Sequence, residues 1–245
     1  MRAWLAALWR KSRWREFALL FGAAGFCLCL WGFVELAEHV PDGRFKATDE
    51  KILRAFRQPD DLAKTIGPAW LREAARDLSA LGGPTVLTLL VLLVIGYLLL
   101  NRQPRMALFL VACIGGGSAV AAVLKQIFVR ERPHVVPHLA EVTSASFPSG
   151  HSMVSSVVYL TLGALIARTM AHRHEKLYFI LAALLLSFLV GVSRVFLGVH
   201  FPTDVLGGWA AGTGWALLCW MVTYWLQCRG ALDASSPTPD DAEEG

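Results

Sequence analysis

The amino-acid sequence predicts an all-α, polytopic membrane protein built as a bundle of six transmembrane helices. Only 17% of its 245 residues are charged, whereas 55% are hydrophobic. A soluble domain of this size carries about 25% charged residues. The apolar residues also form long runs, and roughly 20 such residues let a helix cross the ~30 Å hydrocarbon core of a bilayer. Low charge and long apolar runs therefore favour a membrane protein over a soluble one.

Six apolar runs are long enough to be membrane spans. The first follows a basic stretch, residues 10–15, so a cleaved signal peptide is an alternative to an uncleaved anchor. An A-x-A-like cleavage site is missing because Glu35 and Glu38 flank Ala37, which favours the anchor. The predicted spans are 17–36, 84–100, 106–124, 151–170, 177–198 and 205–226.

The distribution of Lys and Arg predicts that both termini are cytoplasmic. Six spans place both termini on one side, with 11 of the 23 Lys and Arg residues. Four of the other twelve lie in or beside the polar segments described below, which carry charge for another reason. Without these four, the side with the termini has more Lys and Arg than the opposite side, which the positive-inside rule assigns to the cytoplasm. We expect a basic cytoplasmic flank at 1–16, one membrane domain at 17–226 and an acidic, disordered tail at 227–245.

The first outer loop, residues 39–83, is expected to contain two short helices. One begins around Thr48 and ends near Arg57, before Pro59; the other has Pro68 in its first turn. Apolar residues recur at helical spacing in the second helix, with charged residues between them. Two arrangements stay open for this amphipathic pair: helices lying on the outer membrane surface, with Trp70 at the interface, or helices packing on the bundle.

Charged and polar residues gather in three segments at the ends of spans. They are Lys125–Pro133 after the third span, Pro148–His151 before the fourth, and Ser193–Asp204 between the fifth and sixth. Charges near a membrane span are costly and indicate a function. Counting crossings places all three segments on the same side of the membrane, so we expect them to converge on one site.

The residue types in these segments predict a phosphate site. Arginine forks match phosphate oxygens, and lysine adds a compact charge. Ser149 and Gly150 precede a helix start, where free backbone N–H groups favour an anion. The three permanent cations are Lys125, Arg132 and Arg194.

Two histidines and one carboxylate predict the chemistry at that phosphate. One of His151 and His200 can attack phosphorus while the other protonates the departing oxygen. Asp204, four residues after His200, can hold the far nitrogen of that ring and fix its tautomer. A lone histidine is more often structural, and a lone cation at a span end is more often an anchor. The phosphate-site interpretation therefore depends on the histidines, the cations and the carboxylate occurring together.

Other site types are disfavoured. Pro137 interrupts helical pairing of His134 with His138, so we expect no metal site. The five cysteines form no CxxC pair, and we expect no cofactor. The net charge of +4 is too small and dispersed to indicate nucleic-acid binding. The oligomeric state is left open.

The three segments together resemble the type 2 phosphatidic acid phosphatase superfamily, which also contains vanadium haloperoxidases and bacterial acid phosphatases. Its motifs run K-x6-RP, PSGH and SR-x5-H-x3-D. The matching residues are Lys125, Arg132 and Pro133; Pro148, Ser149, Gly150 and His151; and Ser193, Arg194, His200 and Asp204.

The resemblance implies a role for each matching residue. His200 would be the nucleophile that becomes phosphohistidine, Asp204 its orienting partner and His151 the general acid. Ser193 would only help to position its neighbours. The phosphoryl oxygens would be held by Lys125, Arg132, Arg194, Ser149 and Gly150.

We therefore expect a metal-independent phosphatase acting on a phosphorylated lipid at the periplasmic face of a bacterial inner membrane. Candidate substrates are phosphatidic acid, phosphatidylglycerol phosphate, a polyprenyl diphosphate and a lipid A phosphate. A lipid phosphotransferase would use the same residues. A non-enzymatic transporter is a more distant alternative, because transporters tend to bind substrate at mid-membrane. A haloperoxidase is weaker still, because those relatives are soluble.

Overall fold

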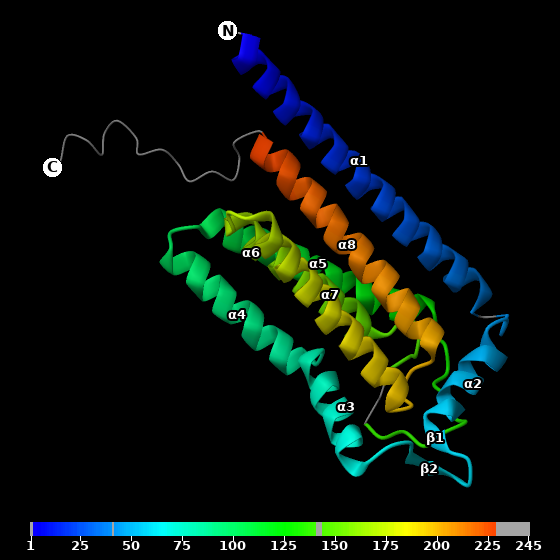
Figure 1. Cartoon of the computed structure of the whole chain (residues 1–245). Coiled ribbons are helices and arrows are strands. Elements are labelled where there is room, and N and C mark those ends of the chain that lie inside the picture. The colour runs from blue at the N-terminus through cyan, green and yellow to red at the C-terminus, as the bar shows by residue number, and fades with distance from the viewer. Residues whose placement is uncertain (1, 41, 141–143, 229–245) are drawn as a thin grey trace.

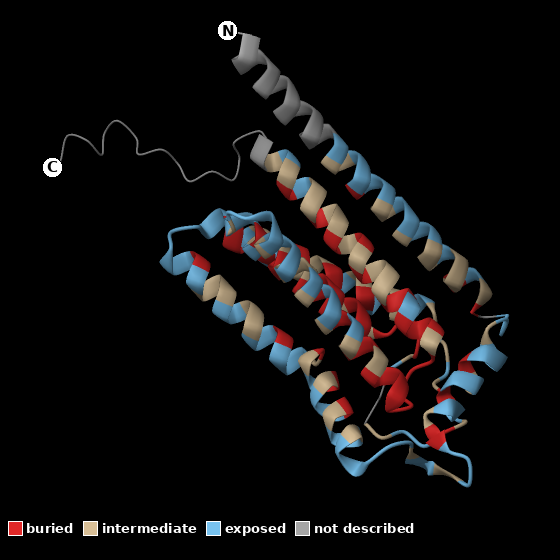
Figure 2. Cartoon of the chain, in the orientation of Figure 1, coloured by how far each residue is buried: buried red, intermediate tan, exposed pale blue. Residues whose placement is uncertain are grey.

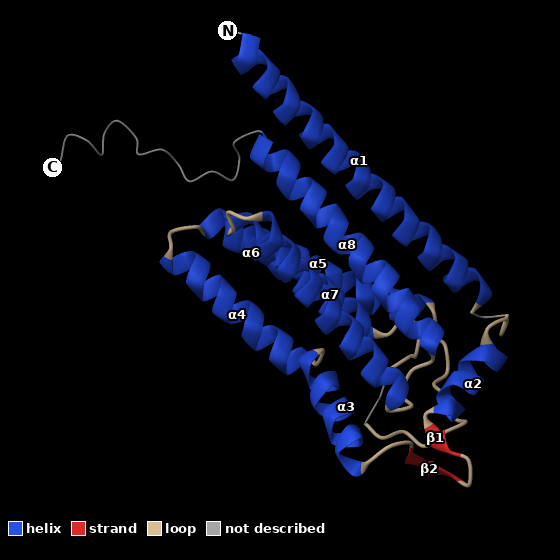
Figure 3. Ribbon diagram, viewed as in Figure 1, coloured by secondary structure: helices blue, strands red, loops and turns tan. Residues whose placement is uncertain are grey.

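The computed structural model describes residues 2–40, 42–140 and 144–228, and the side chains of those residues from 17 to 226. The side chains of the predicted basic flank lie outside this range. So does the predicted acidic tail, apart from the last two residues of the final helix. For the described residues, the chain is a helical bundle with one small hairpin (Figures 1 and 3).

Each predicted span lies on an observed helix, and the bounds agree for one span and differ for the other five. The run expected at 84–100 is α4 (Pro84–Leu100), and the run expected at 177–198 begins four residues earlier and ends two residues earlier, as α7 (Arg173–Phe196). The other long helices are α1 (Arg2–His39), α5 (Pro104–Ile127), α6 (Gly150–Thr169) and α8 (Pro202–Cys228). The all-α membrane fold is confirmed.

Five of these helices are long and apolar enough to cross a membrane individually, and α4 reaches that length only together with α3 (Ala69–Leu81). The two helices meet at an angle of 46°. Gly82 ends α3, and Pro84 occupies the first turn of α4, where its missing N–H costs nothing. The hydroxyl of Tyr159 on α6 donates to the carbonyl of Leu81 at 2.7 Å, which fixes the bend against the core. Counting this bent pair as one span gives six.

Helix α6 lies at the centre of the bundle and is the most buried of the candidate spans. Its buried face packs against α7 and α8, whereas α1 and α4 lie at the periphery and expose large apolar side chains (Figure 2). Exposed residues of this kind include Phe21 and Trp31 on α1 and Leu100 on α4. In a bilayer these side chains would face lipid, which explains an exposed surface richer in Leu and Phe than that of a soluble protein.

Two glycines let α6 and α8 approach closely enough to bring their N-terminal ends together. A Cβ added at Gly208 would collide with the carbonyl of Ser149, and one added at Gly212 would collide with that of Met153. Small residues four apart are a common device for close helix packing in membranes. Backbone continues the contact, since Ser149 N donates to Asp204 O at 2.9 Å. The PSGH segment is thereby held against the first turn of α8.

The loop between α1 and α4 packs on the bundle, which is one of the two arrangements expected for it. Helix α2 (Lys46–Ala55) buries Asp49 and Leu53, and α3 buries Ala75 and Ser79. Both lie at the end of the bundle opposite the start of α1 (Figure 1). Trp70 is 66% exposed, and its predicted place at the membrane interface stays a prediction.

The hairpin between these helices was not predicted from the sequence. Strands β1 (Arg57–Gln58) and β2 (Asp61–Thr65) pair antiparallel, with Gln58 opposite Asp61. Pro59 predicts the end of the preceding helix, but a proline followed by an aspartate also favours a tight turn. The hairpin buries Arg57, whose Nη1 donates to the carbonyl of Phe196 at 2.8 Å and satisfies the C-terminal end of α7.

Candidate active site

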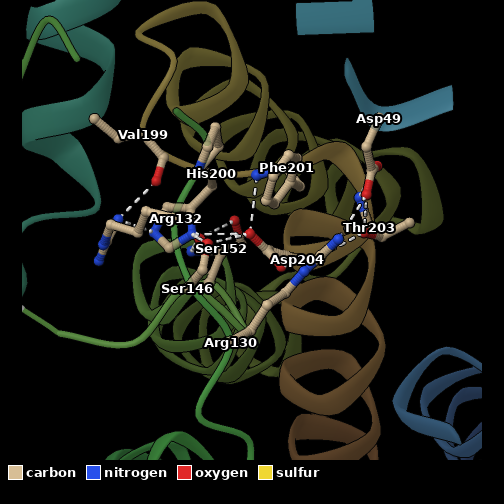
Figure 4. A network of polar contacts seen from close by, with 12 residues as sticks. Asp49, Arg130, Arg132, Ser146, Ser152, Val199, His200, Phe201, Thr203 and Asp204 are labelled. Carbon is tan, nitrogen blue, oxygen red and sulfur yellow. Dashed lines mark hydrogen bonds and ion pairs between the residues drawn. The ribbon is translucent and has the colours of Figure 1, made fainter. Parts of the chain in front are cut away.

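The three polar segments converge at the end of the bundle that also carries α2 and α3 (Figures 1 and 4). Backbone hydrogen bonds hold the loop between α5 and α6 in place. Ser146 N donates to Arg130 O at 2.9 Å, and Leu139 N donates to Leu197 O at 3.0 Å. This loop therefore lies against the turn between α7 and α8, and residues far apart in the sequence share one site.

His200 lies in that turn and is buried, with 1% of its surface exposed. Its Nδ1 is 3.5 Å from Asp204 Oδ2, and its Nε2 is 3.3 Å from Arg132 Nη1. Gly198 makes the turn possible with φ at +75°, a conformation that suits glycine. The ring thus has one nitrogen toward a carboxylate and the other toward a cation.

Asp204 is fixed by donors on both of its oxygens. Its Oδ2 accepts from Ser146 Oγ at 2.5 Å and from Phe201 N at 2.8 Å, while Oδ1 accepts from Arg130 Nη1 at 2.6 Å (Figure 4). These bonds favour the ionised carboxylate. Burial lowers the pKa of His200 to about 4, against the opposing effect of Asp204. The imidazole is therefore neutral at pH 7, and with Nδ1–H directed at Asp204 its Nε2 lone pair is available.

Three cations, called here the cation cluster (Lys125, Arg132 and Arg194), lie near this ring. Arg132 contacts its Nε2, and Arg194 is close enough to act on the ring electrostatically. Lys125 Nζ donates to Ser144 Oγ at 2.8 Å, and Arg132 Nε donates to Ser144 O at the same distance. Arg194 is 4% exposed, and its Nη1 donates to Ser79 Oγ at 2.7 Å. Its buried Nε has no hydrogen-bond partner among the residues that the structure describes. An unpaired guanidinium N–H inside a protein is costly, so this group suits an anion.

The N-terminus of α6 completes the anion site. Ser149 is the N-cap, and its Oγ accepts from Ser152 N at 3.4 Å, so its hydroxyl is engaged within the helix. The N–H groups of Gly150 and His151 have no acceptor within the helix and are free to bind an anion. A Cβ added at Gly150 would lie 3.2 Å from Lys125 Cε, so glycine lets the lysine approach the helix end. Of the expected pair Ser149 and Gly150, the backbone of Gly150 is better placed to contact phosphate.

His151 faces an open pocket of about 270 Å³ next to the cation cluster. The pocket, called here the α3 pocket, is walled by α3, the loop after α5 and the end of α7. Its lining residues are Arg76, Ser79, Ala80, Leu139, Ala140, His151 and Leu197. Ser193, expected only to position its neighbours, donates from Oγ to Val190 O at 2.7 Å inside α7.

Sequence reasoning missed an ionic bridge behind Asp204. Arg130 lies at a variable position of the first motif, so the motif assigns it no role. Its Nη1 and Nη2 contact Asp204 Oδ1 and Asp49 Oδ2 at 2.6 and 3.0 Å, and its Cζ lies 4.2 Å above the Phe201 ring. Asp49 in turn accepts from Thr203 N at 3.1 Å and Oγ1 at 2.6 Å. An acidic residue on the buried side of an amphipathic helix was the available signal.

Comparisons with known proteins identify the family of the chain. The PAP2 superfamily model matches residues 106–228, half of the chain. Phosphatidylglycerophosphatase B of Bacillus subtilis is 33% identical over 182 residues, which cover 74% of this chain and 85% of the relative. Lipid A 1-phosphatase of Rhizobium etli is 31% identical over 43% of this chain and 44% of its own length. Undecaprenyl-diphosphatase of Sulfolobus acidocaldarius is 35% identical over 29% and 30%.

Solved structures give the same result for the fold. The crystal structure of a transmembrane PAP2 type phosphatidylglycerolphosphate phosphatase from Bacillus subtilis superposes with a TM-score of 0.72 at 29% identity, covering 82% of this chain and 96% of that one. Aquifex aeolicus LpxE shares the fold, with a TM-score of 0.53 at 22% identity over 69% and 93% of the two chains.

The fold and the site define the class, an integral membrane enzyme that hydrolyses phosphoric esters. The chain belongs to the PAP2 superfamily.

Proposed function

We propose that this chain hydrolyses the phosphate of a membrane lipid through a phosphohistidine at His200, without a metal ion. The observation that carries the proposal is the placement of His200, with Nδ1 beside Asp204 and Nε2 beside Arg132. A neutral ring in that position can present its Nε2 lone pair to a phosphorus atom bound by the cation cluster. Among the described residues, no group of three or more His, Cys, Asp or Glu side chains could hold a metal.

In the first step, His200 Nε2 forms a bond to phosphorus while the bond from phosphorus to the lipid oxygen breaks. Lys125, Arg132 and Arg194 neutralise the three non-bridging oxygens, where charge is concentrated in the transition state. His151 donates a proton to the departing lipid oxygen. Asp204 stabilises the positive charge that develops on the ring of His200.

In the second step, water attacks the phosphohistidine on the face that the lipid alcohol has left. His151, now without its proton, accepts one from that water as the bond from phosphorus to His200 Nε2 breaks. Inorganic phosphate leaves and both histidines return to their starting states. The same geometry thus serves both half-reactions.

The names of the relatives support a lipid substrate. They include enzymes named for phosphatidylglycerol phosphate, lipid A and undecaprenyl diphosphate. The relative with the widest coverage is a phosphatidylglycerophosphatase, so phosphatidylglycerol phosphate is the first substrate to test. A site at one end of the bundle lets the acyl chains stay in the membrane while the head group reaches the cations.

The decisive experiment measures inorganic phosphate released from a single lipid by the purified protein in detergent. We expect release from phosphatidylglycerol phosphate, with and without EDTA, and inhibition by vanadate. Omitting any acceptor lipid distinguishes a hydrolase from a phosphotransferase, which would release no phosphate. Loss of activity in EDTA with recovery in Mg²⁺ would contradict the metal-free mechanism.

We also propose that the site faces the periplasm of a bacterial inner membrane. The Lys and Arg bias supports cytoplasmic termini, and the α1 start lies at the end of the bundle opposite the site (Figure 1). A cysteine replacing Lys64, which is 67% exposed, should react with a membrane-impermeant maleimide in intact spheroplasts. A cysteine replacing His174 should not, and the chain without either cysteine is the control. The opposite labelling would place the site in the cytoplasm.

A further inference from the structure

We infer that the α3 pocket is a subsite for a second phosphate, carried by the leaving group of the substrate, and that Arg76 is its cation. This inference rests on the proposed lipid phosphatase activity. It concerns a part of the site that the three motifs do not cover, because Arg76 belongs to α3 and lies before the segment matched by the family model.

The first support is the position of the pocket relative to the general acid. His151 and Arg76 line the same pocket, His151 from the first turn of α6 and Arg76 from α3. In the proposed mechanism, His151 protonates the oxygen that departs. The rest of the leaving group therefore extends into the α3 pocket, which His151 and Arg76 both line.

The second support is the shared helix face. Arg76, Ser79 and Ala80 are three and four residues apart, so they present one face of α3 to the pocket. Ser79 Oγ accepts from Arg194 Nη1 at 2.7 Å, which ties this face directly to the cation cluster. A group in the pocket therefore meets Arg76 on the same helix face that anchors a cation of the cluster.

The third support is the availability of the Arg76 charge. Its side chain is 45% exposed, and Nη1 contacts the two carboxylate oxygens of Glu73 at 3.1 and 3.3 Å. Exposed pairs of this kind contribute little, so an anionic substrate can take over the guanidinium without a large cost. A guanidinium bound to a phosphate makes stronger, charge-assisted hydrogen bonds.

This arrangement distinguishes two classes of lipid. The leaving group of phosphatidic acid is neutral diacylglycerol, which offers Arg76 no charge. The leaving group of phosphatidylglycerol phosphate carries a phosphodiester, and that of a polyprenyl diphosphate carries a phosphate monoester. Substrates with two phosphates should therefore gain binding at Arg76 that phosphatidic acid cannot gain.

The test compares kcat/KM of the full-length protein and Arg76→Gln on three lipids in neutral detergent micelles. We expect Arg76→Gln to lose about 10-fold on phosphatidylglycerol phosphate, on a polyprenyl diphosphate, or on both, as for a hydrogen bond to a charged group. Activity on phosphatidic acid should change less than about 2-fold, which also shows that the variant is folded. Arg72→Gln is the matched control, because Arg72 lies on the same helix and contacts the same Glu73 but does not line the pocket.

The pattern of losses decides the inference. A loss confined to one of the two-phosphate lipids supports it and identifies which of them the pocket holds. An equal loss on all three lipids, no loss on any, or the same selective loss in Arg72→Gln would overturn it. If the unaltered protein releases phosphate from none of the lipids, the proposed function fails and this inference fails with it; a failure of the inference alone leaves lipid hydrolysis intact.

Discussion

Helices α2 and α3 come from the same loop and are both short and amphipathic, yet they support opposite sides of the candidate active site. Asp49 of α2 forms an ion pair with Arg130, and Arg130 also pairs with Asp204 beside the His200 ring. Ser79 of α3 accepts a hydrogen bond from Arg194 of the cation cluster, and Arg76 of the same helix lines the α3 pocket. In each helix the polar residue on the buried face, rather than the amphipathic pattern, decides what the helix does.

The largest effect should come from the α2 side of the site, at the carboxylate that α2 supports. Asp204→Asn removes the charge that stabilises the imidazolium and places an amide beside the guanidinium of Arg130. By analogy with a triad aspartate, we expect kcat to fall by about 10⁴ with the protein still folded. Activity within 10-fold of the unaltered protein would mean that another group, such as Ser146, orients the ring.

The leaving-group side should show an effect that depends on the substrate. His151→Ala removes the proton donor, so hydrolysis of a phospholipid should fall by about 10²–10⁴. On p-nitrophenyl phosphate, whose leaving group needs no proton, the same variant should lose far less relative to the unaltered protein. His200→Ala is the contrast, with no activity on either substrate. Equal relative losses for His151→Ala on both substrates would assign His151 to phosphate binding.

The two helices themselves can be separated by kinetics. Asp49→Asn weakens the support of Asp204 and should lower kcat by about 10-fold with little change in KM. Ser79→Ala frees Arg194 from its anchor. It should mainly raise KM, by a smaller factor, because in the proposed mechanism Arg194 binds the phosphate in the ground state as well. Lys51→Gln, at an exposed position of α2, controls for general effects on that helix. If both variants changed kcat and KM alike, the two helices would have a single scaffolding role.

The smallest effect concerns acid pH. The pKa of His200 lies at about 4 in the folded protein because burial disfavours the charged ring, below the ordinary value of 6.5. Between these values the unfolded chain binds more protons, so the stability from this residue is complete above pH 6.5 and declines as the pH falls toward 4. The Tm of the unaltered protein should therefore drop a few degrees more than that of His200→Gln between pH 7 and about pH 4.5. Parallel curves would mean that His200 is already charged in the folded state.

Local patterns were enough to predict the spans and the three motifs. Long apolar runs specify membrane helices without reference to their neighbours, and the parity of six crossings already places Lys125, His151 and His200 on one side. The hairpin around Pro59 was missed because a two-residue strand has no period to detect. The partner of Asp49 was missed because an acid on an amphipathic helix usually faces water.

The sequence by itself determined the class of fold and the three polar segments that meet at one end of the bundle, because spacing and residue type carry that information locally. The residues at phosphate and the roles of the two histidines stay predictions. Only the tertiary structure decided which side chains pair with the charged residues of these segments. Arg130 reaches Asp49 across 81 residues of sequence, and Arg194 reaches Ser79 across 115. Such pairs form because a buried charge must find a partner among whatever groups the packed helices bring near it, and no periodicity in the chain records which group that will be.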